Sequence, residues 1–133
     1  MIYLLDTNVC IAAMRGNPQV LARLLACAPT DCGVSTVCLY ELIAGVERCQ
    51  HPEREMKKVE ALVAPLHILP FDEFAAARTA GLRRRLEMKG EIIGPYDLMI
   101  AGQAIALDVT LVTHNTREFQ RVDGLKLEDW QTT

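Results

Sequence analysis

The feature that most constrains the fold is a regular alternation of short apolar-rich runs with longer segments of helical periodicity. The runs at 2–5, 32–34, 66–69, 110–113 and 125–127 are three or four residues long and predict strands. Strands that alternate with helices along a chain form a parallel sheet layered between helices. The sequence therefore predicts one three-layer α/β/α domain over 1–133 with a short, mainly parallel central sheet.

The predicted helices begin at residues that favour helix N-termini. Pro18, Pro52 and Pro95 suit a first turn, where a missing N–H group costs least, and Ser35 and Asp72 can act as caps. The expected helical segments are 9–14, one that opens at Pro18, 37–49, 52–63, one from Asp72 towards Gly90, 95–107, and a single turn at 117–122.

Composition narrows the class of protein further. No apolar run reaches the roughly 18 residues that a membrane-spanning helix needs, and the N-terminus lacks the basic start of a secretory signal. Five cysteines, an odd number without a C-x-x-C pair, favour buried free thiols and a cytoplasmic location. A net charge of −3 excludes a strongly basic nucleic-acid clamp but leaves room for contact through a local basic face or a metal.

Three acids occupy positions where a simple surface role is a poor explanation. Asp6 directly follows the first predicted strand, and Glu41 lies at the edge of an apolar helix face beside small residues. Asp97 opens a helix that is apolar nearly all round and therefore buried. Taken singly, each has an ordinary alternative: a helix cap for Asp6, a boundary glutamate for Glu41, and compensation of the helix dipole for Asp97.

Taken together, the three acids predict a metal site. Ligands bind beyond the carboxyl ends of parallel strands, and this spacing allows all three acids to converge there. Clustered carboxylates repel one another unless a cation neutralises them, and ligands that are all oxygen suit Mg²⁺, with Mn²⁺ as a substitute. The three histidines lack the spacing of a zinc site; His114, which follows a strand, borders the predicted site and could contact a phosphate.

Four sequence motifs, in this order, strongly resemble the PIN-domain ribonucleases, and their spacing matches the VapC toxins of bacterial toxin–antitoxin pairs. The motifs are Leu5-Asp6-Thr7-Asn8, the segment from Tyr40 to Gly45, the segment from Gly94 to Ala101, and the segment from Leu111 to Phe119. The tail from Arg121 to Trp130 resembles the enterobacterial VapC branch that cleaves initiator tRNA in its anticodon loop.

The resemblance implies a set of site residues. Asp6, Glu41 and Asp97 match the metal-binding and catalytic acids of the family. Many PIN domains carry Asp where this chain has Asn115, so Glu118, three residues on, is the expected fourth acid. Positions expected to orient the carboxylates and water are Thr7, Asn8, Ser35, Thr113 and Asn115.

The resemblance also implies an activity and partners. One or two Mg²⁺ ions would assist hydrolysis of an RNA phosphodiester, leaving a 5′-phosphate and a 3′-hydroxyl. The expected partners are a small VapB-like antitoxin, an RNA substrate that is a tRNA, and a second copy of the chain in a homodimer. No membrane association is expected.

Two other functions stay open on the sequence alone. A phosphohydrolase with an aspartyl nucleophile also places an Asp after its first strand, but Asn8 departs from its D-x-D motif and no lysine follows a late strand near the site. A non-catalytic module could instead use the acidic pocket to bind an arginine of a partner. Trapping a phospho-aspartate at Asp6 would favour the former, and absence of cleavage in Mg²⁺ or Mn²⁺ the latter.

Overall fold

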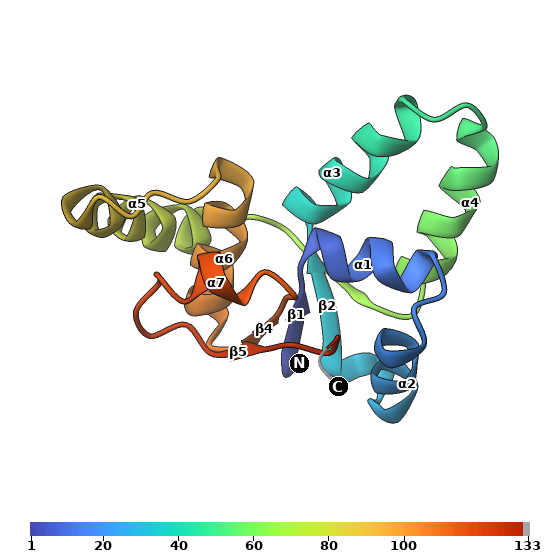
Figure 1. The fold of residues 1–133 in the computed structure, drawn as a ribbon, viewed down its shortest axis with the longest axis horizontal. Coiled ribbons are helices and arrows are strands. Elements are labelled where there is room, and N and C mark those ends of the chain that lie inside the picture. Colours follow the sequence, from blue (N-terminus) through green and yellow to red (C-terminus); the bar gives the residue numbers. More distant parts are fainter. Residues whose placement is uncertain (132–133) are drawn as a thin grey trace.

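The computed structural model describes residues 1–131, so the last two residues of the predicted 1–133 domain lie outside the described part (Figure 1). Strands and helices alternate as the sequence predicts. In chain order the elements are β1 (Tyr3–Leu5), α1 (Thr7–Met14), α2 (Pro18–Ala26), a 3-10 turn η1 (Pro29–Asp31), β2 (Cys32–Ser35), α3 (Thr36–Glu47), α4 (Pro52–Val63), β3 (His67–Leu69), α5 (Glu73–Lys89), α6 (Pro95–Leu107), β4 (Thr110–Val112), α7 (Thr116–Phe119) and β5 (Leu127–Glu128).

The five described strands form one sheet in the order β3-β2-β1-β4-β5, and every neighbouring pair is parallel. The first strand therefore occupies the centre of the sheet. Leu5 at its end pairs with Val34 on one side and with Val112 on the other. Because the strands run the same way, the residues that follow β1, β2 and β4 all leave the sheet at one edge.

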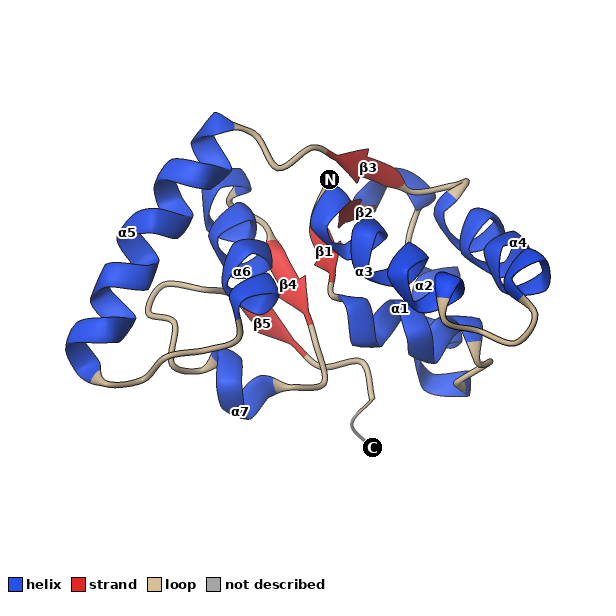
Figure 2. Ribbon diagram, turned by 90° about the horizontal axis from the view of Figure 1, so that it is seen from above, coloured by secondary structure: helices blue, strands red, loops and turns tan. Residues whose placement is uncertain are grey.

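Helices cover both faces of the sheet and complete the predicted three-layer fold. Figure 2 shows α5 and α6 on one side of the strands and α1 to α4 on the other. One core runs through the layers, from Leu4 and Leu5 in the sheet to Ile100 in α6 and Phe119 in α7. In α6 every residue from Leu98 to Ala104 except the half-buried Met99 is buried, which confirms that its near-continuous apolar sequence marks a buried helix.

The structure moves some element boundaries. The last strand starts at Leu127 rather than 125, because the Leu125 N–H donates back to the Val122 carbonyl and closes a turn before the strand. The turn after β4 spans only 116–119, and the η1 turn was not predicted. All five cysteines are free, as predicted, but Cys27 is only half-buried and Cys49 is exposed.

No helix within residues 1–131 is both long and apolar enough to cross a membrane.

Candidate active site

The Asp6 carboxyl lies at the edge of the sheet where β1 and β4 end. Its backbone N–H donates to the Val112 carbonyl at 3.1 Å, which places Thr113 beside it. Its Oδ1 accepts from the Val9 N–H at 2.9 Å, so Asp6 does cap α1, as the alternative reading holds. The pKa of Asp6 is raised, with burial as the largest cause. Hydrogen bonds to Thr113 and Val9 act against this rise, and the negative charges of Glu41 and Asp129 add to it.

The Glu41 side chain reaches the same edge from the middle of α3. Its Oε1 accepts a hydrogen bond of 2.7 Å from the Thr7 hydroxyl, which joins α3 to the first turn of α1. The buried Ser35 oxygen accepts from the Val37 N–H and so fixes where the helix that carries Glu41 begins. Thr7 therefore orients a carboxylate directly, whereas Ser35 acts through the start of the helix.

The Asp97 carboxyl lies in the first turn of α6, on the opposite side of the sheet from α3. Its pKa is raised to about 6. Burial is the largest cause, followed by the charges of Glu118, Asp6 and Glu41 and by a hydrogen bond shared with Glu118. The charges on all three other predicted acids thus bear on Asp97.

The Glu118 side chain lies next to Asp97 and is held by two donors. Its Oε1 accepts from the Gly94 N–H at 2.9 Å, and its Oε2 accepts from the Asn115 side-chain amide at 2.6 Å. Glu118 forms no ion pair with the neighbouring Arg117 or Arg121, and the Arg121 guanidinium donates to the Ile92 carbonyl instead. Asn115, at the position where many PIN domains carry the fourth acid, therefore positions Glu118.

The four acids have no internal cation to balance them. Within residues 1–131, no lysine, arginine or histidine forms an ion pair with any of the four. Burial and neighbouring negative charge raise the pKa values of Asp6 and Asp97. A group of donors that are all oxygen, without a cation among them, fits a hard divalent cation. Among residues 1–131, no group of three Asp, Glu, His or Cys side chains is already placed to bind one metal ion. Sharing an ion among three of these acids therefore requires side-chain movement.

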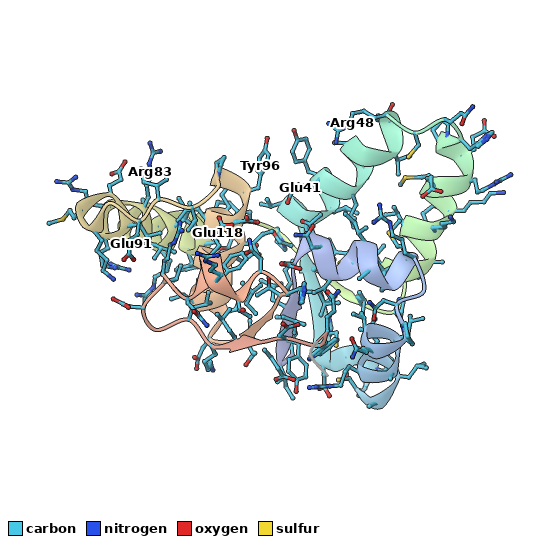
Figure 3. All side chains as sticks on the ribbon, viewed as in Figure 1. Glu41, Arg48, Arg83, Glu91, Tyr96 and Glu118 are labelled. Carbon is cyan, nitrogen blue, oxygen red and sulfur yellow. The ribbon has the colours of Figure 1, made fainter. Side chains whose placement is uncertain are left out.

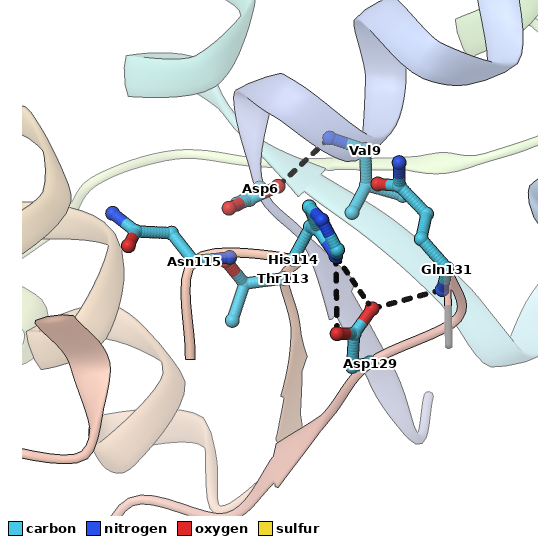
Figure 4. A network of polar contacts seen from close by, with 7 residues as sticks. All are labelled: Asp6, Val9, Thr113, His114, Asn115, Asp129 and Gln131. Atoms are coloured by element: carbon cyan, nitrogen blue, oxygen red, sulfur yellow. Dashed lines mark hydrogen bonds and ion pairs between the residues drawn. The ribbon is translucent and has the colours of Figure 1, made fainter. Parts of the chain in front are cut away.

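A fifth carboxylate, Asp129, was not anticipated from the sequence. Figure 4 shows it below Asp6 and in contact with His114 and Gln131. The His114 Nδ1 atom lies 3.1 and 3.2 Å from its two oxygens, and the Gln131 N–H donates to it at 2.8 Å. The tail brings Asp129 back across β4 because β5 pairs with that strand. The only sequence signal for Asp129 is that it directly follows the last strand. That signal is weak, because β5 has just two residues.

The remaining predicted position, Asn8, lies beside the acids rather than among them. Asn8 is exposed and lines a polar depression of about 390 Å³ together with Arg15, His114, Asn115 and Gln131. His114 thus borders the site, as predicted.

The rim of the site carries an aromatic pair that the sequence did not single out. Tyr40 of α3 and Tyr96 of α6 are exposed, and each precedes one of the acids in the chain. Figure 3 shows Tyr96 close to Glu41 above the ends of the strands, with Glu118 on the far side.

Comparison with known proteins places this fold and site in a family. Residues 3–125 match the family model of the PIN domain. The chain is 40% identical to the tRNA(fMet)-specific endonuclease VapC of Shigella flexneri, over 96% of this chain and 97% of that protein. It is also 40% identical to Ribonuclease VapC2 of Rickettsia felis, over 98% of both.

Solved structures agree with the sequence relatives. VapBC2 from Rickettsia felis, bound to a DNA fragment from their promoter, contains a chain that superposes with a TM-score of 0.93 at 37% identity, over 98% of this chain and 100% of that one. DNA-bound VapBC from Salmonella typhimurium gives a TM-score of 0.94 at 38% identity, over 98% of both chains. The chain belongs to the PIN domain family and, within it, to the VapC proteins.

Proposed function

We propose that this chain is the toxin of a toxin–antitoxin pair and a metal-dependent endoribonuclease. The observation that carries the proposal is the group formed by Asp6, Glu41, Asp97 and Glu118. Asp6, between β1 and α1, meets the acids of α3, α6 and α7 at one sheet edge. The charges of the other three add to burial in raising the pKa of Asp97. None of the four forms an ion pair within residues 1–131. Such an arrangement lowers stability, so a function that requires a cation is its simplest explanation.

The residues of the chain would divide the work by position. Asp6, Glu41, Asp97 and Glu118 would hold Mg²⁺ or Mn²⁺, which when bound supplies activation of water and stabilisation of phosphoryl charge. The Thr7 hydroxyl keeps Glu41 turned towards the site, and the Asn115 amide and Gly94 N–H do the same for Glu118. Hydrogen bonds of this kind reduce the side-chain freedom that metal binding would otherwise remove.

Initiator tRNA is the proposed substrate. Support comes from the Shigella flexneri relative, named a tRNA(fMet)-specific endonuclease, which aligns with nearly the whole of this chain. The acidic site repels phosphate without its metal, so backbone contacts must come from residues around it. The depression lined by Arg15 and His114 beside the acids offers such contacts. We propose cleavage in the anticodon loop.

A VapB-like antitoxin is the proposed partner, with a homodimer of this chain in the assembled complex. An apolar groove of about 520 Å³ between α1, α2 and α4 includes Leu24 and Leu25. It shares Met14 and Lys58 with a second groove of about 260 Å³, which ends at Glu41. An extended antitoxin segment in both grooves would reach the acids and place a basic side chain against them.

The test uses purified chain freed of any antitoxin. It is incubated with total RNA in Mg²⁺, in Mn²⁺ and in excess EDTA, and cleaved ends are mapped by sequencing. We expect cleavage in either metal, none in EDTA, 5′-phosphate ends, and sites concentrated in the anticodon loop of initiator tRNA. Cleavage that persists in excess chelator would refute the metal requirement. Cleavage of all tRNAs at similar rates would refute the proposed specificity for initiator tRNA.

A further inference from the structure

Tyr40 and Tyr96 form a ring pair across the mouth of the acidic site. Their ring centroids are 5.5 Å apart at an interplanar angle of 62°, and the two hydroxyl oxygens are 3.3 Å apart. Tyr40 comes from α3 on one face of the sheet and Tyr96 from α6 on the other. The pair therefore links the two helical layers directly above the strand ends.

The exposure of these rings is unusual for this chain. It has three tyrosines, three phenylalanines and one tryptophan. Only three of these rings are exposed, namely Tyr40 (54%), Tyr96 (42%) and Phe74 (68%). Two of the three thus meet at the candidate active site, whereas Tyr3 and Trp130 pack edge-to-face elsewhere.

The position of the pair relative to the acids is fixed by the chain itself. Tyr40 immediately precedes Glu41, and Tyr96 immediately precedes Asp97. The Tyr96 hydroxyl lies 3.3 Å from the Tyr40 hydroxyl, and Figure 3 shows Tyr96 beside Glu41. A phosphodiester held at the acids would have its neighbouring base beside these rings.

We propose that Tyr40 and Tyr96 are a stacking site for a base next to the scissile phosphodiester of a single-stranded RNA segment. An acidic site gains little affinity for RNA from its own charge, so uncharged contacts must contribute. Stacking on tyrosine supplies such contacts, because every base has an aromatic face. The two rings meet edge to face and both stay exposed, so a base can reach the ring faces that the contact leaves uncovered.

The inference rests on the proposed function, and binding separates the two. The Asp97→Asn chain, in which cleavage should be blocked, is titrated into an anticodon stem–loop of initiator tRNA that carries 2-aminopurine in the loop. Fluorescence anisotropy of a terminal dye gives the Kd, and 2-aminopurine quenching reports stacking. Tyr40→Ala and Tyr96→Ala are added to this background, with Tyr40→Phe and Tyr96→Phe to keep the ring. Phe74→Ala is the matched loss of an exposed ring elsewhere.

We expect each alanine variant to weaken binding by roughly 5- to 150-fold and to reduce the quenching. The dependence of Kd on salt should stay unchanged, because no phosphate contact is lost. The phenylalanine variants and Phe74→Ala should bind within about twofold of the background. Melting temperatures show that each variant is folded.

Three outcomes would overturn the inference. Unchanged Kd and quenching in both alanine variants would remove the stacking role. Phenylalanine variants as weak as the alanine variants would assign the effect to the hydroxyls. The alanine variants could instead keep RNA binding but change the oligomer mass measured by light scattering, or the affinity for the antitoxin. That result would assign the rings to a protein interface. Wild-type chain that binds and quenches but never cleaves would instead refute the nuclease proposal alone.

Discussion

At the scale of single residues, the ionisation of Asp97 links the candidate site to stability. A carboxyl whose pKa in the folded chain is about 6, above its ordinary value of 3.8, binds more protons folded than unfolded between those values. The free energy of unfolding therefore falls as the pH rises through that window, and the full cost is present above it. Because Asp97 is only half-buried, solvent screens its charge and we discount this cost to about 1 kcal/mol.

Asp97→Asn should accordingly abolish cleavage and raise the melting temperature of the metal-free chain. The expected rise is about 3 °C at pH 7.5 in EDTA, and it should nearly vanish at about pH 2.5, where Asp97 is almost fully protonated in both states. Lost attraction to the N-terminus of α6 opposes part of the gain. Scanning calorimetry at both pH values measures the difference.

Asp123→Asn is the matched control, because Asp123 is exposed and Lys89 lowers its pKa. This variant should not gain stability at pH 7.5. A sharp fall in the melting temperature of Asp97→Asn would show that Asp97 serves mainly as a structural residue at the start of α6.

The fourth acid provides a second residue-scale prediction. Glu118→Gln should impair Mg²⁺-dependent cleavage more than Asn115→Ala, because only Glu118 contributes charge and Asn115 acts by donating to its Oε2. High Mg²⁺ should partly rescue Glu118→Gln. Cleavage rates measured against Mg²⁺ concentration decide between them: a Glu118→Gln curve that coincides with wild type would reject Glu118 as a ligand.

At the scale of elements, the packing of α5 on α6 holds Asp97 in place. A Cβ atom added at Gly102 would lie 2.0 Å from the Thr79 Oγ1 and 2.8 Å from its Cα. The Thr79 hydroxyl already donates to the Ala75 carbonyl, and its backbone cannot move without shifting α5. The close approach of these two helices therefore depends on the missing side chain.

Gly102→Ala should destabilise the fold by about 2 kcal/mol through overpacking and should reduce cleavage, because α6 carries Asp97. Gly45→Ala in α3 is the control, since an added Cβ there has nothing within 4 Å. It should gain about 0.5 kcal/mol from helix propensity. Urea unfolding of both variants gives the comparison. Equal stability changes would mean that α5 and α6 can separate at little cost.

These two glycines also show how far the sequence reaches. Both lie in apolar helices, and nothing local distinguishes the one that touches a neighbouring helix. Periodicity and capping residues did predict the strand and helix order, and the buried character of α6 correctly marked Asp97 as unusual. The Asp129 contact with His114 and the meeting of Tyr40 with Tyr96 depend on how distant elements pack, which no local pattern encodes.

At the scale of the whole molecule, the grooves and the acidic site form one surface. The groove between α1, α2 and α4 leads through Met14 and Lys58 to the one that ends at Glu41. Leu25 lines the far end and is 86% exposed, although α2 is otherwise amphipathic and packs Val20 inside. An exposed leucine in such a groove is explained if the antitoxin covers it.

Leu25→Asp should therefore weaken the antitoxin complex by roughly 10- to 100-fold, the value of one buried leucine side chain, while leaving the melting temperature of the free chain unchanged. Met88→Asp, on α5 and 71% exposed, is the matched control outside the groove. Antitoxin affinity is measured by calorimetry, and inhibition by cleavage of initiator tRNA. The connected grooves are lined by Leu25 and Glu41. The weaker complex should therefore also need less dilution before it cleaves RNA. Wild-type affinity and inhibition in Leu25→Asp would place the antitoxin on another face.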